Sequence, residues 1–321
     1  MPLYDLPPPA RQIYVHTFLD RSRARVLHQA IQTAAAAIAP ATLRSEIAQY
    51  APAAGLRALQ GTTVRDELVF ATPSILRHTP SALGYYRLLL GISQKRFYTS
   101  ATGLSAFKAM EERNTLRNTV APLIGGLCTA LNLSLGTLLE SLPASSLAMD
   151  IDQLPLLTLG AQADGSWRNL IGREATAGVF DALKEVVRQQ KVQFSETAHS
   201  ITARNSSGRD VTLQLAADPD VVIKEVVNGA TIVKAAIEIK GGTDQSNVHN
   251  RAGEAEKSHR KAHRDGAQDF WTVISLAGAN MAVLRGESPT TRQWFDVEEV
   301  LAQSGTTWDK LVNHTISAMG I

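Results

Sequence analysis

The chain has 321 residues, of which 44% are hydrophobic and 19% charged, and its formal net charge is +2. This length allows two domains with ordinary hydrophobic cores, and the nearly neutral charge neither requires nor excludes a polyanionic partner. Cys128 is the single cysteine, which excludes an internal disulfide bond, and the apolar stretch around it is typical of a buried structural thiol.

The N-terminal residues predict no secretion signal, because residues 1–9 lack the basic and apolar stretches of a signal peptide. No segment approaches the roughly 18 uninterrupted apolar residues of a membrane span. Residues 34–39 are apolar, but Pro40 ends this short run. Together with the lone cysteine, these features predict a soluble cytoplasmic protein.

Residues 1–150 are predicted to form a mainly α-helical subdomain. They are rich in Ala, Leu, Gln and Arg, which favour helices, and strand patterns are scarce among them. Prolines separate the expected helices, which cover residues 20–39, 41–50, 63–70, 81–90, 104–114 and 118–131. Residues 149–165 contain Asp, Pro and Gly and are expected to form a linker or crossover.

Residues 151–321 are predicted to form a second domain of the α/β (α+β) class, with a central mixed sheet flanked by helices. Apolar residues repeat with helical spacing over residues 170–190. The alternation typical of strands follows in residues 192–196, 201–203 and 211–215. Two β-branched runs come next, and Asn228-Gly229 between them is a strong hairpin signal. Beyond them we expect a helix at 251–264, a strand at 270–276 and two helices, from Asp296 and from Thr306 or Thr307.

Three polar residues stand at the ends of the two hairpin runs. Pro219-Asp220 opens the first run, and Glu238-Ile239-Lys240 closes the second. Because strand side chains alternate between faces, Glu238 and Lys240 share one face. Carboxylates are hard oxygen ligands that suit Mg²⁺, and an ammonium group can orient a water and stabilise negative charge. The three residues therefore suggest metal-dependent hydrolysis of a phosphodiester, although the local pattern also fits a solvated hairpin edge.

The position of Asp220 depends on the register of the hairpin. A strict two-residue turn at Asn228-Gly229 would place Asp220 opposite Ile237, on the wrong face. A three-residue loop or a bulge would place it opposite Glu238 instead. The catalytic interpretation therefore predicts an odd-length loop or a bulge.

Two further carboxylates are candidates for the same site. Glu174 lies in the expected helix before the sheet, where the helix dipole alone also accounts for an acidic residue. Asp218 is two residues from Asp220 and shares its face, so it is an alternative ligand. Gly241-Gly242 follows Lys240 directly, which would let a backbone or a substrate approach closely.

These residues resemble the PD-(D/E)xK nucleases, and within them the type II restriction endonucleases. Pro219-Asp220 matches the PD and Glu238-Ile239-Lys240 the (D/E)xK, and the expected order of elements over residues 168–280 is similar to the common core of that family. Residues 84–98 look like a segment of the helical part of several such enzymes. The whole chain is most similar to the XcyI/XmaI group, for which the recognition sequence would be CCCGGG.

The resemblance implies a restriction-endonuclease-like core that uses Mg²⁺ to hydrolyse double-stranded DNA at a palindromic site. Asp220 and Glu238 would bind the metal, Lys240 would complete the catalytic set, and Glu174 would correspond to the helix acid of some members. A palindromic target implies a homodimer, with the helical subdomain contacting DNA, dimerising or both. A cognate DNA methyltransferase is expected as a functional rather than a physical partner.

Candidate DNA-binding residues lie in three segments. The expected helix at 251–264 has five Lys and Arg against two Glu, and a face of small residues and His259 that suits packing on the sheet; a solvated amphipathic helix is the alternative. The preceding loop, residues 243–250, carries hydrogen-bonding groups suited to base edges. The basic residues at 87–96 lie among aromatic residues, which fits either phosphate contacts or a structural aromatic core. The candidates are Arg251, Lys257, Arg260, Lys261, Asn247, His249, Arg87, Lys95 and Arg96.

Other functions stay open at this point. A repair or junction-resolving nuclease would share the PD-(D/E)xK core, and a catalytically inert DNA-binding module would retain the sheet without the chemistry. A helical scaffold protein would show no salt-sensitive binding to DNA.

Overall fold

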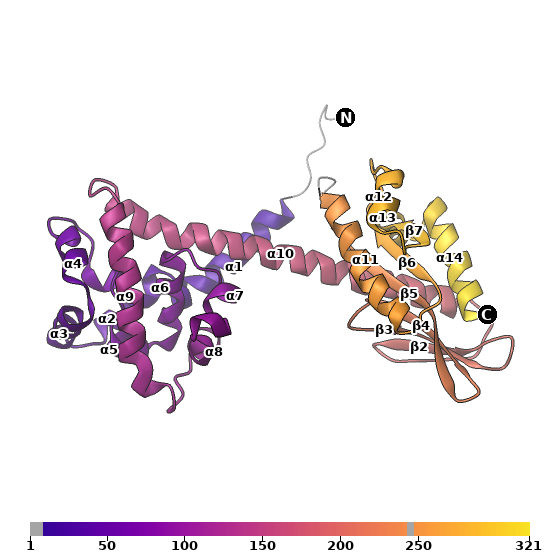
Figure 1. Ribbon diagram of the computed structural model, residues 1–321, viewed down its shortest axis with the longest axis horizontal. Helices are drawn as coiled ribbons and strands as arrows, with labels where there is room; N and C mark the ends of the chain where they lie inside the picture. The colour runs from indigo at the N-terminus through magenta and orange to yellow at the C-terminus, as the bar shows by residue number, and fades with distance from the viewer. Residues whose placement is uncertain (1–8, 243–246) are drawn as a thin grey trace. The chain divides into compact units, whose positions relative to one another are not determined.

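The computed structural model describes residues 9–242 and 247–321, and the chain divides into two compact units, Met1–Trp167 and Arg168–Ile321. Figure 1 shows the elements of both. The division lies within one helix, α10 (Leu147–Arg188). The prediction of a linker or crossover at residues 149–165 is therefore wrong, since these residues are helical and Pro155 is accommodated inside the helix.

Unit 1 consists of helices, as its composition indicates. The prediction of a helix over residues 63–70 is wrong, because only a 3₁₀ turn forms there, at Asp66–Leu68. Three helices of this unit, α4, α5 and α7, were not predicted. Pro40 and Pro73 occupy the first turns of α3 and α5, where a missing N–H costs nothing. The helices are α1 (Ala10–Val26), α2 (His28–Ala36), α3 (Pro40–Tyr50), α4 (Ala53–Leu59), α5 (Pro73–His78), α6 (Leu83–Leu89), α7 (Gln94–Phe97), α8 (Lys108–Arg113) and α9 (Ile124–Ser141).

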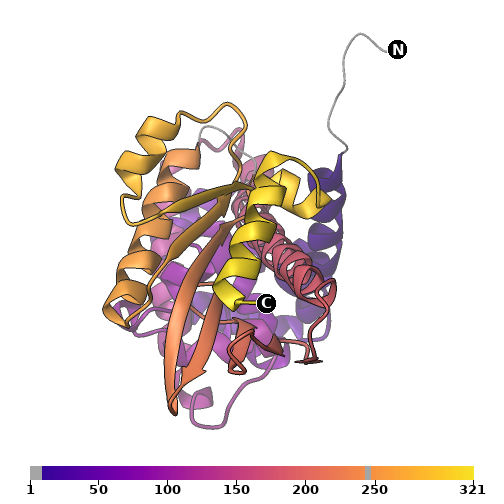
Figure 2. The same ribbon diagram turned by 90° about the vertical axis from the view of Figure 1, so that its right-hand side faces the viewer.

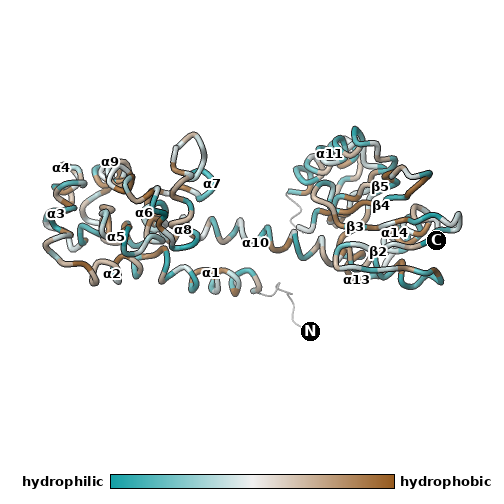
Figure 3. The backbone as a smooth tube through the Cα atoms, turned by 90° about the horizontal axis from the view of Figure 1, so that it is seen from below, coloured by the Kyte–Doolittle hydropathy of each residue, from teal (hydrophilic) through white to brown (hydrophobic). Residues whose placement is uncertain are grey.

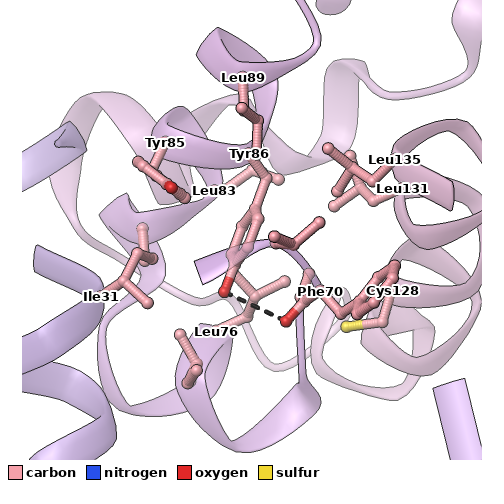
Figure 4. Packing of buried hydrophobic residues seen from close by; sticks show 14 of the residues in the cluster. Ile31, Phe70, Leu76, Leu83, Tyr85, Tyr86, Leu89, Cys128, Leu131 and Leu135 are labelled. Atoms are coloured by element: carbon pink, nitrogen blue, oxygen red, sulfur yellow. Dashed lines mark hydrogen bonds between the residues drawn. The ribbon is translucent and has the colours of Figure 1, made fainter. Parts of the chain in front are cut away.

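The core of unit 1 gathers apolar side chains from most of its helices. Figure 4 shows Phe70, Tyr86 and Leu131 within it, and the hydroxyl of Tyr86 donates to the backbone oxygens of Glu67 and Phe70. Cys128 is fully buried in this cluster, which confirms the predicted structural thiol. Among the described helices, the stretch Ala121–Ser141 is long and apolar enough to cross a membrane, but one side of it packs into this core.

Unit 2 is built around a seven-stranded mixed sheet in which the strands lie in chain order. Strands β1 to β5 form an antiparallel meander, and β5, β6 and β7 run parallel. The predicted mixed sheet is confirmed, although β7 was not expected. The strands are β1 (Phe194–Glu196), β2 (Ser200–Arg204), β3 (Asp210–Leu215), β4 (Val221–Val227), β5 (Ala230–Lys240), β6 (Phe270–Ile274) and β7 (Gln293–Asp296).

Helices cover both faces of this sheet (Figure 2). Ile237 and Ile239 of β5 pack against α10 and α14 (Thr306–Met319). The alternate residue Ala236 packs against α11 (Val248–Arg264), through Ala262. Glu238 and Lys240 alternate with Ile237 and Ile239, so they lie on the α11 side. Two short helices, α12 (Met281–Glu287) and α13 (Val297–Ala302), complete the unit.

Of the helices that follow the hairpin, α11, α13 and α14 were predicted from the sequence, whereas α12 was not. Asp296 caps α13 by accepting hydrogen bonds from the backbone N–H groups of Glu298 and Glu299, as expected of a helix beginning there. Hydrophilic residues predominate along α11 (Figure 3), while the small face predicted for this helix is confirmed, because Ala252, Ala255, His259 and Ala262 are all buried.

Candidate active site

The register of the β4–β5 hairpin decides which side chains meet. Asn228 and Gly229 form a two-residue turn with φ of 51° and 79°, and Val227 pairs with Ala230. This is the tight turn that, continued regularly, would place Asp220 on the wrong face. The odd-length loop is therefore not what the chain uses.

A bulge within β5 corrects the register. Lys224 pairs with Val233, but the next residue of β4, Ile223, pairs with Ala235, so Lys234 is the extra residue. From there the ladder continues to Val221 opposite Ile237, and the residue before Val221 is Asp220, opposite Glu238. The predicted bulge is confirmed, and it brings the start of β4 and the end of β5 together on the face that α11 covers.

The polar side chains of this site contact one another. Asp220 Oδ2 accepts a hydrogen bond of 2.8 Å from the backbone N–H of Ile239. The Nζ of Lys240 lies 2.9 Å from Glu238 Oε1, and Glu238 is only 5% exposed. The backbone of β5 thus holds Asp220, and Glu238 and Lys240 hold each other, at the place where the start of β4 lies beside the end of β5.

Burial makes the negative charges of this site costly. Burial and the nearby charge of Asp220 together raise the pKa of Glu238 to about 7, against the opposing effect of Lys240. Burial likewise raises the pKa of Asp220. Burial opposes the charge on Lys240, but the Glu238 carboxylate outweighs it and raises the pKa of the ammonium group. A bound cation would relieve the repulsion between the carboxylates.

The donor set fits a divalent cation that keeps part of its water shell. Among the described residues, no group of three or more His, Cys, Asp or Glu side chains gathers at one point. Asp220 and Glu238 alone would supply two oxygen ligands, and Mg²⁺ is usually bound through one or two carboxylates with waters and substrate phosphate completing its shell. These residues are therefore suited to such an ion, although they do not form a closed protein cage.

One side of α11 borders the same site. Glu254 Oε2 lies 3.6 Å from the Nζ of Lys240, and the Nζ of Lys261 lies 2.9 Å from Asp218 Oδ2. The hydrogen bond from Lys261, together with one from Ser258, lowers the pKa of Asp218. Asp218 is thus engaged by α11, whereas Asp220 faces Glu238. The sequence placed Glu254 and Lys261 on one helix face but gave no sign that this face meets the hairpin.

A second neighbour of the site was not predicted. Thr272 of β6 pairs with Glu238 across the parallel ladder and is fully buried. Its hydroxyl lies 3.0 Å from Nε2 of His259, also fully buried. Burial lowers the pKa of His259 to about 4, so the ring is neutral. Only the place of His259 among small residues of α11 signalled its burial in the sequence.

The glycines after Lys240 are required by close packing. A Cβ on Gly241 would collide with Ala175 of α10, and one on Gly242 would collide with the guanidinium of Arg251, which donates to the Gly242 carbonyl oxygen. The predicted close approach of a backbone is confirmed for Gly241, whereas Gly242 is approached by the flexible side chain of Arg251. Glu174 is adjacent to Ala175 and exposed, so its catalytic role stays a prediction.

The predicted DNA-binding residues differ in their surroundings. Asn247 accepts a hydrogen bond of 2.8 Å from Asn250 at the start of α11, and residues 243–246 of the expected recognition loop lie outside the described part of the chain. Arg260 is held by Glu256, as Lys261 is by Asp218. The exposed candidates are His249, Lys257, Arg260, Lys261, Lys95 and Arg96.

Arg87 is not available to DNA in this structure, and the prediction that it binds DNA is wrong. Its side chain is 1% exposed, and its Nε and Nη2 lie 2.8 and 2.6 Å from the carboxylate oxygens of Glu111. The physical reason is that a buried guanidinium needs a buried partner, and Glu111 provides it.

Comparisons with known proteins find relatives that match nearly the whole chain. The family model described as XcyI restriction endonuclease matches residues 16–321. The chain is 34% identical to the type II restriction enzyme XcyI of Xanthomonas campestris pv. cyanopsidis, over 99% of this chain and 96% of that protein. It is also 34% identical to the type II restriction enzyme Cfr9I of Citrobacter freundii, over 98% of this chain and 96% of that protein.

Proposed function

Because the chain belongs to the XcyI restriction endonuclease family, we propose that Asp220, Glu238 and Lys240 are the catalytic centre of a type II restriction endonuclease. Such an enzyme hydrolyses phosphodiester bonds at a specific sequence in double-stranded DNA. The observation that carries this assignment is the bulge at Lys234, which places Asp220 opposite Glu238.

The enzyme uses a divalent metal ion, for which we propose Mg²⁺ held by Asp220 and Glu238. When bound, the ion supplies positive charge to the phosphate and makes a coordinated water more acidic. The low exposure of Glu238 keeps the site poor in competing water, so charges act strongly there.

Lys240 orients the attacking water and stabilises the charge that develops on the phosphate during in-line displacement. Its Nζ is fixed between Glu238 Oε1 at 2.9 Å and Glu254 Oε2 at 3.6 Å. A flexible lysine held at both sides loses less freedom when the transition state forms, so these contacts favour catalysis. Glu174 is kept as a candidate for a supporting carboxylate.

The proposed target is the one that the resemblance to the XcyI/XmaI group implies, and the proposed assembly follows from the symmetry of a palindrome. We propose CCCGGG as the recognition sequence and a two-fold homodimer in which each site cuts one strand. The enzyme would act in the cytoplasm beside a DNA methyltransferase that protects the host sequence. Phosphate and base contacts would come from Arg251, Lys257, Arg260, Lys261, Asn247, His249, Lys95 and Arg96.

Digestion of a plasmid of known sequence by the purified protein tests this proposal. We expect discrete fragments whose ends map to CCCGGG, only when Mg²⁺ is present. Discrete ends at another sequence would correct the target alone. Cutting that follows DNA structure rather than sequence would indicate a repair or junction nuclease, and binding without cutting would indicate an inert DNA-binding module.

A further inference from the structure

A basic pocket is lined in part by α11, through residues that include Lys257 and Arg264, each about one turn from Lys261. Its volume is about 690 Å³, and its walls come from α11, the start of β6 and the segment before β7. Among the described residues that line it, none is Asp or Glu. The basic residues that line it are Lys257, Arg260, His263, Arg264 and Arg292.

A buried carboxylate that is not itself part of the lining holds two of the pocket's lining residues, Arg260 and Thr290. Glu256 is 6% exposed, and its Oε1 accepts hydrogen bonds from Arg260 Nε at 2.7 Å and Thr290 Oγ1 at 2.9 Å. Its Oε2 accepts from the backbone N–H of Thr290 at 3.0 Å and from Ser288 Oγ at 3.1 Å. Glu256 therefore ties α11 to the segment before β7 and fixes Arg260 at the pocket, so the site is prearranged.

The opposite wall is fixed by the sheet. Phe270 opens β6, and its backbone oxygen accepts a hydrogen bond of 2.9 Å from the N–H of Arg292. The guanidinium of Arg292 donates to the backbone oxygen of Gln268 at 3.2 Å, and the residue is exposed. The pocket thus presents guanidinium and ammonium donors around an apolar floor.

The pocket is close to the catalytic residues on the same face of the sheet. Arg292 is two strands from Glu238 and about two residues further back along the strands, because Phe270 pairs with Ala236. With strands about 4.8 Å apart and about 3.3 Å per residue, the separation is roughly 12 Å. That distance equals the rise of about three to four base pairs of DNA.

We propose that this pocket binds phosphate groups of the DNA backbone beside the cleaved sequence. The inference rests on the proposed nuclease function and names a further contact with its substrate. Phosphate oxygens are acceptors, which match a lining rich in Arg and Lys donors. Base edges offer donors as well as acceptors, and the lining has few acceptor groups, so the contact adds affinity and fixes orientation without reading sequence.

The test is the salt dependence of DNA binding in a protein that cannot cut. Lys257→Ala and Arg292→Ala are combined in a Glu238→Ala background, and dissociation constants are measured over a salt series with a 30-base-pair duplex. Each lost phosphate contact lowers the slope of log K against log salt by about 0.9, so we expect a decrease of about 1.8. The decrease is the same for duplexes with and without CCCGGG. Arg285→Ala, an exposed arginine of α12 outside the pocket, leaves the slope unchanged.

Three outcomes would overturn the inference. The slope stays unchanged in the double variant, or it changes only with duplexes that contain the recognition sequence. Alternatively, inorganic pyrophosphate binds the parent protein tightly and loses affinity in the double variant while DNA binding is unaffected, which would assign the pocket to a small anion. Arg292→Lys, which keeps the charge, is expected to retain most of the slope and excludes a folding defect.

Failure of this inference is distinct from failure of the proposed function. If the wild-type protein cuts DNA at its sequence and the double variant binds with an unchanged slope, the pocket assignment alone is wrong. If the wild-type protein cuts no DNA, the catalytic proposal itself is wrong.

Discussion

Each unit of the molecule contains a buried pair of opposite charges, and the two pairs differ in how many partners they have. In unit 1, the carboxylate of Glu111 accepts from Arg87, from the hydroxyl of Tyr98 at 2.7 Å and from Gln94 at 3.4 Å. In unit 2, the carboxylate of Glu238 is paired with Lys240 alone among the described residues. We call the first pair saturated, because its carboxylate has several hydrogen-bond donors, and the second unsaturated. A saturated pair stabilises a fold, whereas an unsaturated pair beside a second carboxylate can accept a ligand.

The largest expected effect is on catalysis at the unsaturated pair. Glu238→Ala or Lys240→Ala should reduce the rate of DNA cleavage at least about 1,000-fold, because the first removes a proposed ligand of the metal ion and the second removes positive charge that stabilises the transition state. Binding of DNA should persist in a filter or gel assay. Lys224→Ala, in the same hairpin, is the matched control and should cut normally. Cleavage at the wild-type rate by either variant would refute these roles.

The next effect is on stability at the saturated pair. Glu111→Gln leaves the buried guanidinium of Arg87 without its counter-charge and should lower the free energy of unfolding by about 3–5 kcal/mol. Glu112→Gln, next to it on α8, removes only an exposed pair with Lys108 and should cost less than about 1 kcal/mol. Urea denaturation of both variants makes the comparison. Equal stability of the two would show that the buried pair is not structural.

A smaller effect on stability is expected at Glu238, where the charged carboxylate destabilises the fold instead of stabilising it. In the unfolded chain this carboxyl loses its proton near the ordinary glutamate pKa of 4.5, whereas in the folded protein it does so near 7. Its contribution to the free energy of unfolding therefore falls as the pH rises from about 4.5 to 7, by about 1–3 kcal/mol. Unfolding measured at pH 5 and pH 8 without divalent cations should show this loss, and Glu238→Gln should reduce it. If the free energy of unfolding of that variant depends on pH as strongly as in the wild type, another titrating group is responsible.

Repulsion between the carboxylates of Asp220 and Glu238 predicts that a bound metal ion stabilises the fold. At pH 8, Mg²⁺ should raise the melting temperature of the wild-type protein, because it binds the folded carboxylate pair and not the unfolded chain. The increase should be absent from Glu238→Gln, and chelation by EDTA should reverse it. An equal increase in the variant would place the ion at another site.

The sequence predicted the hairpin at Asn228-Gly229 and the need for either an odd-length loop or a bulge, since both follow from residue types and from the two-residue period of a strand. It did not predict that Lys234 is the bulged residue, because no side chain marks that choice and the packing on both faces of β5 decides it. The proposed catalytic residues were identified from their motif, but whether Asp220 lies opposite Glu238 depended on this unpredicted detail.

Other features depended on contacts between distant parts of the chain. Arg87 was placed among DNA-binding candidates because its partner, Glu111, is 24 residues away and helical spacing does not connect them. The helix across residues 149–165 was missed because its proline is tolerated within a long helix. The pocket residue Arg292 precedes β7, a strand too short to have been expected.

Asp218 and Asp220 offer the most direct test of the catalytic centre, because they are two residues apart in the chain but differ in their partners and in their burial. Single-turnover cleavage of a duplex containing CCCGGG is measured with Mg²⁺ for Asp218→Asn and Asp220→Asn. Asp220→Asn should lose at least about 1,000-fold in rate, and Asp218→Asn should stay within about tenfold of the wild type, because it loses a partly exposed ion pair with Lys261. Normal cutting by Asp220→Asn, or an equal loss in both variants, would contradict the assignment.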